Sequence, residues 1–150
     1  MERYPIGETD AASVEVRRHQ RADFGYGGFS LCILLHEGQT LLRLPGHYGG
    51  VLAERLRAAD TLLGDETDVD GRRVYRDEFL ELTALEEDDE SLLALTTTAR
   101  APVRVALKLA RDELQPLASL LEEAQRVVDT LRQGISLVPD YPPDRFADPA

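Results

Sequence analysis

One segment, PVRVALKLARDELQPLASLLEEAQRVV at residues 102–128, changes along its length from the periodicity of a strand to that of a helix. In residues 103–109, valine and leucine alternate with arginine, alanine and lysine, and this period of two is typical of a strand with one buried face. In residues 114–131, apolar residues recur at steps of three and four, which predicts an amphipathic helix that stops at Gly134. The segment therefore predicts a half-buried strand that leads into a helix.

An earlier segment has the same pattern. Residues 39–63, QTLLRLPGHYGGVLAERLRAADTLL, align within the segment 102–128 at a constant offset of 65. The matched positions are Leu44, Leu52, Ala53 and Leu56 with Leu109, Leu117, Ala118 and Leu121. Upstream, SVEV from Ser13 aligns with FLEL from Phe79 at a nearly equal offset. A duplicated unit explains both alignments, and chance similarity between two amphipathic stretches is the alternative.

The remaining elements follow from composition and turn signals. Residues 29–36 are almost wholly apolar, which is typical of a central strand, and a Glu-Gly pair predicts the tight turn that follows. Residues 52–63 have the spacing of a helix, but Gly49 and Gly50 leave its start open because glycine is a poor helix former. The expected strands are residues 13–21, 29–36 and 39–44 in the first unit, 78–84, 91–98 and 103–109 in the second, and a short extra strand at 72–76.

The predicted fold class is α+β. It consists of two pseudo-repeated antiparallel strand–strand–strand–helix units, at about residues 13–64 and 72–134, whose helices pack on one face of the sheet. We expect a single domain over residues 1–134 that is made of the two repeats, since 150 residues suit a single domain or a close pair of small repeats. Residues 135–150 hold four of the eight prolines, so this tail is expected to be either disordered or an extended arm.

Composition and charge exclude several classes of protein. The chain has 150 residues, of which 43% are hydrophobic and 30% charged, and its apolar runs are short, so we expect a globular protein with no membrane segment. Residues 1–64 contain seven Arg and eight acidic residues, so their net charge is −1. Residues 65–150 contain nine Arg, one Lys and twenty acidic residues, so their net charge is −10. A net charge of −11 argues against indiscriminate binding of nucleic acid. The acidic start MERYPIGETD and the single Cys32 lead us to expect a cytoplasmic protein.

Signatures of catalysis and of metal binding are missing from the sequence. It contains no nucleophile elbow, no phosphate-binding P-loop, no His-Glu-x-x-His motif and no paired Cys-x-x-Cys. Residues 66–77 partly match the sequence pattern of a calcium-binding loop. The first ligand position holds Glu instead of Asp and the last holds Asp instead of Glu, so we interpret this segment as a solvated turn. The acidic run at residues 86–90 is interpreted as a solvated hairpin loop, and Cys32 as a core residue. We therefore expect no enzyme activity, no catalytic residue, no cofactor and no metal.

Candidate binding residues come from the face of the sheet that the helices leave open. Strand alternation places basic residues there, and DFGYGGF at residues 23–29 adds aromatics among glycines, on which bases can stack. The candidate nucleic-acid-binding residues are Arg17, Arg21, Phe24, Tyr26, Arg43, Arg104 and Lys108. Two alternatives stay open: the basic residues are ordinary solvated positions of a half-buried sheet, and the aromatics fold back onto the core.

The order of elements resembles the PC4-like, Whirly and PUR-repeat group of single-stranded nucleic-acid-binding proteins. The closest local likeness is VRVALKLARDELQPLASLLEEA, which looks like their final strand running into a helix, and the resemblance covers residues 13–133 by topology. It implies that the sheets contact DNA or RNA, that the helices build a dimer, and that the basic candidates occupy the contacting positions. The strong acidity and the apparent lack of a fourth strand in the first unit depart from this group.

The leading hypothesis is a non-enzymatic homodimeric protein that binds single-stranded DNA or RNA through its open sheet face. The alternative is a protein-protein interaction module, such as a chaperone or adaptor, that holds a peptide or partner protein on the same sheet, on the long leucine-rich helix or on the acidic loop.

Overall fold

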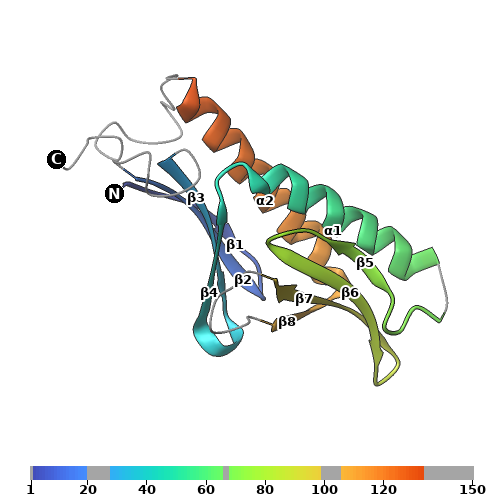
Figure 1. Cartoon of the computed structure of the whole chain (residues 1–150). Coiled ribbons are helices and arrows are strands. Elements are labelled where there is room, and N and C mark those ends of the chain that lie inside the picture. Colours follow the sequence, from blue (N-terminus) through green and yellow to red (C-terminus); the bar gives the residue numbers. More distant parts are fainter. Residues whose placement is uncertain (1, 20–27, 66–67, 99–105, 134–150) are drawn as a thin grey trace.

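The computed structural model describes residues 2–19, 28–65, 68–98 and 106–133, in which two antiparallel sheets and two α-helices are arranged as two successive units (Figure 1). The first unit contains β1 (Glu2–Glu8), β2 (Ala12–Arg18), β3 (Phe29–Leu35), the short 3-10 helix η2 (Glu37–Gln39), β4 (Thr40–Pro45) and α1 (Tyr48–Asp65). The second contains β5 (Arg73–Arg76), β6 (Leu80–Glu87), β7 (Glu90–Thr97), β8 (Ala106–Ala110) and α2 (Arg111–Arg132). The predicted α+β fold class is confirmed.

The strands form because apolar side chains alternate along them. In β2, Ala12, Val14 and Val16 are buried, whereas Glu15 and Arg17 lie on the opposite face. β4 and β6 alternate in the same way. Each sheet is a meander, with the orders β1-β2-β3-β4 and β5-β6-β7-β8, so that strands adjacent in sequence are hydrogen-bonded neighbours. As expected from its apolar sequence, β3 lies inside its sheet.

Each unit has four strands before its helix, so the predicted repeat of three strands and a helix is roughly supported, and the first unit has one strand more than expected. The missed strand is β1, where Tyr4 is buried but Pro5 and Gly7 interrupt the pattern that marks a strand. β1 is an edge strand, and its register against β2 shifts between Pro5 and Gly7. The first unit therefore begins at Glu2 rather than near residue 13. In the second unit, the short extra strand that was expected is β5.

The two helices run antiparallel and cross closely at the start of α1. A Cβ atom at Gly49 would lie 2.6 Å from the backbone oxygen of Leu121, and the backbone N–H of Gly50 donates to Gln125 Oε1 at 3.2 Å. Farther along, Asp60 of α1 accepts a hydrogen bond from Gln115 of α2. The glycines that weaken the helical pattern in the sequence are thus the residues that let the two backbones approach.

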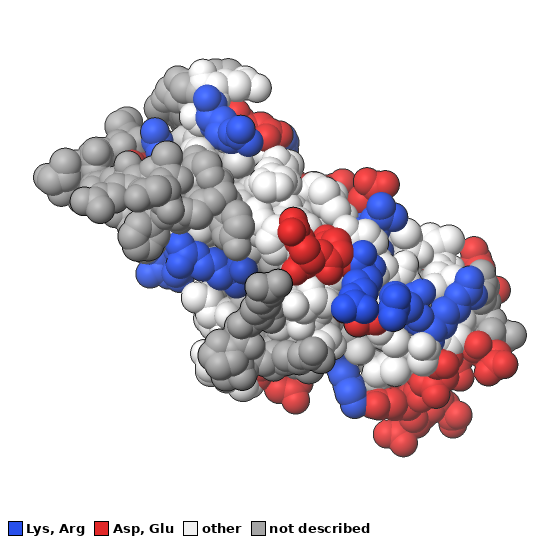
Figure 2. All heavy atoms as spheres, in the orientation of Figure 1, with Lys and Arg blue, Asp and Glu red and all other residues white. Residues whose placement is uncertain are grey.

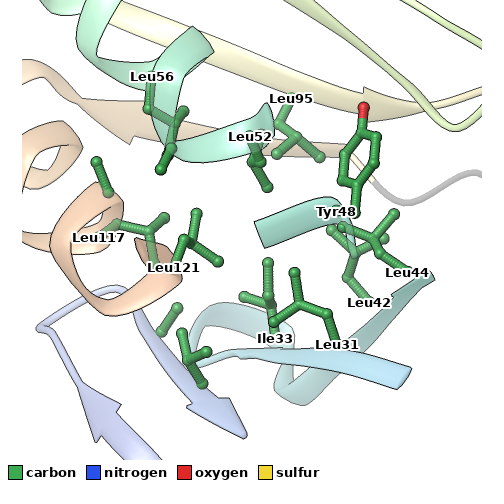
Figure 3. Packing of buried hydrophobic residues seen from close by; sticks show 14 of the residues in the cluster. Leu31, Ile33, Leu42, Leu44, Tyr48, Leu52, Leu56, Leu95, Leu117 and Leu121 are labelled. Atoms are coloured by element: carbon green, nitrogen blue, oxygen red, sulfur yellow. The ribbon is translucent and has the colours of Figure 1, made fainter. Parts of the chain in front are cut away.

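Both units contribute to a single hydrophobic core. Helix α2 packs against β1 and β2 of the first sheet as well as against β7 and β8, and α1 packs against α2 and β7. Figure 3 shows Ile33 of the first sheet, Leu52 of α1, Leu95 of the second sheet and Leu121 of α2 pointing into one cluster. The expected apolar stripe of α2 is buried at Leu114, Leu117, Ala118, Leu121, Ala124, Val127, Val128 and Leu131.

Charge is distributed unevenly over the surface. The acidic side chains of residues 86–90 are exposed at the hairpin between β6 and β7, as predicted, and Figure 2 shows acidic side chains gathered there beside a row of basic ones.

Neither described helix is both long and apolar enough to cross a membrane. The predicted tail at residues 135–150 lies outside the described part of the chain.

Candidate binding surface on the first sheet

The face of the first sheet that points away from the helices carries three rows of side chains, which the strand register fixes. The first row runs from Glu8 and Ser13 to Leu34 and Leu41, and its part on β3 and β4 is apolar. The other rows are Pro5, Glu15, Cys32 and Arg43, and Arg3, Arg17, Ser30 and Pro45. Polarity therefore changes along the strands, from apolar at one end of the face to basic at the other. We call this surface the outer face of the first sheet.

A groove of about 380 Å³ lies over the apolar end of the outer face. Leu41, the second residue of the edge strand β4, is 42% exposed at this groove. The residues that line the groove are Pro5, Gly7, Glu8, Ser13, Val14, Glu15, Cys32, Leu34 and Leu41. Apolar side chains with a few polar groups around them are typical of binding sites rather than of ordinary solvated strands.

Glu15 lines the groove on the side of the basic end and pairs with two arginines. Arg3 Nη2 lies 2.6 Å and Arg17 Nε 3.0 Å from its carboxylate oxygens. The hydrogen bond from Arg3 lowers the pKa of Glu15, and Arg17 lowers it further against the opposing effect of burial. Glu15 therefore stays ionised and neutralises part of the arginine charge on this face.

Arg43 is held differently, by neutral partners. Its Nε donates to Ser30 Oγ at 3.1 Å, its Nη2 donates to His19 Nε2 at 2.8 Å, and His19 Nε2 lies 2.9 Å from the same serine oxygen. Burial, with the charges of Arg43 and Arg17, lowers the pKa of His19. A neutral imidazole can accept the hydrogen bond from Arg43, so the lowered pKa agrees with this geometry.

The predicted site residues divide between the two sheets. Arg17 and Arg43 lie together on the outer face of the first sheet, whereas Lys108 lies on the second sheet, where its Nζ is 2.6 Å from Glu87. The second sheet repeats the arginine–glutamate pair of the first, with Arg73 Nε 2.9 Å from Glu81. Arg21, Phe24, Tyr26 and Arg104 lie outside the described residues.

A cysteine and a histidine of the first unit are buried or hydrogen-bonded within the fold. Cys32 is fully buried and burial raises the pKa of its thiol, as expected of a core cysteine. His36 Nε2 lies 2.8 Å from Ser13 Oγ, and its Nδ1 lies 3.0 Å from the Asp10 carbonyl oxygen. Within the described ranges, no three side chains of His, Cys, Asp or Glu are grouped so that they could hold a metal ion.

The apolar part of this surface was not predicted from the sequence. Leu34 and Cys32 belong to a strand that is apolar on both sides, and such a run does not reveal that one side forms the floor of a groove. Arg3 and Pro5 were missed together with β1. The available signal was the alternation of Leu41 and Arg43 with buried leucines, because it places a leucine on the polar side of a strand.

No known protein-family model matches this chain, and no curated protein sequence matches it.

Proposed function

We propose that this protein is a non-enzymatic binding module that holds an extended segment of a partner protein on the outer face of its first sheet. The observation that supports it most is the groove with the exposed Leu41, next to a cluster of basic side chains. An extended peptide presents side chains on alternate sides, so apolar groups can enter the groove while polar groups reach the basic end.

The charges of the outer face favour a peptide over a nucleic acid. Glu8 and Glu15 line the groove, and a polyanion that crossed it would meet both carboxylates. Arg3 and Arg17 are already paired with Glu15. A peptide that carries an isolated acidic residue avoids this repulsion and still gains from the basic end.

The proposal is tested by selecting binders from a random peptide library against the full chain. We expect peptides with apolar residues at alternate positions, whose affinity falls by about tenfold or more in Leu41→Asp, because a carboxylate replaces the apolar contact. The matched control is Val51→Asp on α1, which changes a large exposed apolar side chain that does not line the groove. Failure to enrich peptides, or equal loss in both variants, would contradict the proposal.

Single-stranded DNA or RNA is a second candidate ligand, supported by one feature of the outer face. The basic end gathers Arg3, Arg17 and Arg43 on the outer face of the first sheet. Fluorescence anisotropy of labelled oligo(dT) tests it. Binding that weakens steeply with salt and is lost in Arg43→Glu but not in Arg73→Glu supports nucleic acid; no binding at low salt removes it.

The expected homodimer stays a prediction. Sedimentation equilibrium over a range of concentrations measures the oligomeric state, and a monomer at all concentrations would contradict it.

A further inference from the structure

We infer that Arg43 is a carboxylate-binding position, and that the partner segment carries an acidic residue about four positions from the apolar side chain that enters the groove. This inference rests on the proposed function and adds the chemistry of the partner. It depends on the orientation of one guanidinium group and on its place relative to the groove.

The hydrogen bonds of Arg43 leave one edge of its guanidinium group open. The group has five N–H donors in a planar fork. Its side edge, formed by Nε and Nη2, is occupied by Ser30 at 3.1 Å and His19 at 2.8 Å. Its end edge, formed by Nη1 and the second hydrogen of Nη2, has no acceptor among the residues that the structure describes. Two parallel N–H groups on that edge match the two oxygens of a carboxylate.

Arg43 is also the arginine of this face whose charge is least compensated. Arg3 and Arg17 share Glu15, whereas no carboxylate in the described ranges pairs with Arg43. Arg43 is exposed, so a ligand can reach it. The hydroxyl of the fully buried Ser30 accepts a hydrogen bond from Arg43 and thereby holds the guanidinium group in one orientation. Because the group is already ordered, less conformational entropy is lost when a ligand binds.

The strand register sets the spacing between groove and guanidinium. Leu41 lies in the first row, whereas the guanidinium of Arg43 reaches Ser30 in the third. The first and third rows are therefore separated by four residues along a strand, which is a distance of roughly 13 Å. An extended peptide that runs along the strands covers this distance in about four residues, so we expect an apolar residue and an Asp or Glu at that separation.

A carboxylate titration tests the anion site without any peptide. The full chain, labelled with nitrogen-15, is titrated with sodium acetate and, separately, with sodium chloride at equal ionic strength. We expect a saturable shift of the Arg43 Nε–Hε resonance with acetate and a much smaller one at Arg73, whose Nε is paired with Glu81. Equal responses of the two arginines, or equal effects of acetate and chloride, would overturn the inference.

A pair of designed peptides tests the spacing. The two peptides share an apolar residue and differ only in Asp or Asn four positions away. We expect the Asp peptide to bind the native protein about tenfold more tightly, in line with the strength of charge-assisted hydrogen bonds. In Arg43→Gln this preference should fall below about twofold, while Arg73→Gln, the matched control on the second sheet, should keep it.

The outcomes separate the inference from the proposed function. Peptide binding that depends on Leu41 but shows no preference for Asp leaves the proposed function standing and overturns the inference. If no peptide binds and oligo(dT) binds through Arg43 instead, both the peptide class and the acidic residue are overturned. If acetate shifts Arg43 and the Asp preference disappears only in Arg43→Gln, both are supported.

Discussion

Asp77, in the connection between β5 and β6, accepts four hydrogen bonds, one of which comes from Tyr48 and joins the two units. Its Oδ1 accepts from the backbone N–H groups of Phe79 at 2.7 Å and Leu80 at 3.0 Å. Its Oδ2 accepts from the hydroxyl of Tyr75 at 2.7 Å and from that of Tyr48 at the start of α1. Burial alone would raise the pKa of Asp77, but these hydrogen bonds hold it below its ordinary value.

We expect Asp77→Asn to lower the free energy of unfolding near neutral pH by roughly 2 kcal/mol, because hydrogen bonds to a charged acceptor are lost. A carboxyl group with a lowered pKa in the folded state stabilises the fold fully above its unfolded pKa, about 3.9, and loses this effect as the pH falls through the folded pKa. The difference between native protein and variant should therefore shrink below about pH 4. Urea unfolding at several pH values measures it.

The control for Asp77 is Asp70→Asn, since exposed Asp70 accepts one backbone hydrogen bond, from Glu86 at 3.0 Å. This variant should change stability by less than about 1 kcal/mol. A difference for Asp77→Asn that does not depend on pH would show that its charge contributes nothing to the junction of the units.

Among the elements, the crossing of α1 and α2 depends on one glycine more than on its neighbour. At Gly49 an added Cβ would meet the backbone oxygen of Leu121 at 2.6 Å, and a backbone atom cannot move aside. At Gly50 the nearest atom is the flexible Gln125 side chain, at 3.4 Å. We expect Gly49→Ala to destabilise the protein by about 1–3 kcal/mol, as overpacking does.

The neighbouring substitution, Gly50→Ala, is the matched control. It adds the same methyl group one residue later in the same helix, and it should be neutral or stabilise by up to about 1 kcal/mol, because alanine is the better helix former. Chemical unfolding of both variants measures the contrast. Equal effects of the two substitutions would show that the helices do not cross as closely as Gly49 requires.

Across the whole molecule, each unit depends on the other for its core. Helix α2 covers β1 and β2, and α1 packs against β7, so each unit depends on a helix from the other half. We therefore expect fragments 1–66 and 67–150 to be unfolded when separate, since each leaves a large apolar surface without cover. Mixing them should restore cooperative unfolding, measured by circular dichroism. A fragment that unfolds cooperatively by itself would contradict a shared core.

Local patterns were enough to predict most elements. The alternation along β2, β4 and β8 and the apolar stripe of α2 follow from the side-chain periods of a strand and of a helix with one buried face, and these periods can be read directly from the sequence. β1 escaped prediction because Pro5 and Gly7 mask a short edge strand, whose position is stabilised by pairing with β2 rather than by its own propensity.

By itself, the sequence of this protein determined that apolar residues recur with the periods of strands and helices, twice, and that the polar side of the strands carries Arg17 and Arg43. Only the tertiary structure decided which helix covers which sheet, where the apolar side of β3 becomes a groove, and which edge of Arg43 stays open. The reason is physical: periodicity depends on residues close in the chain, whereas grooves and hydrogen-bond networks depend on strand register and on contacts between distant segments.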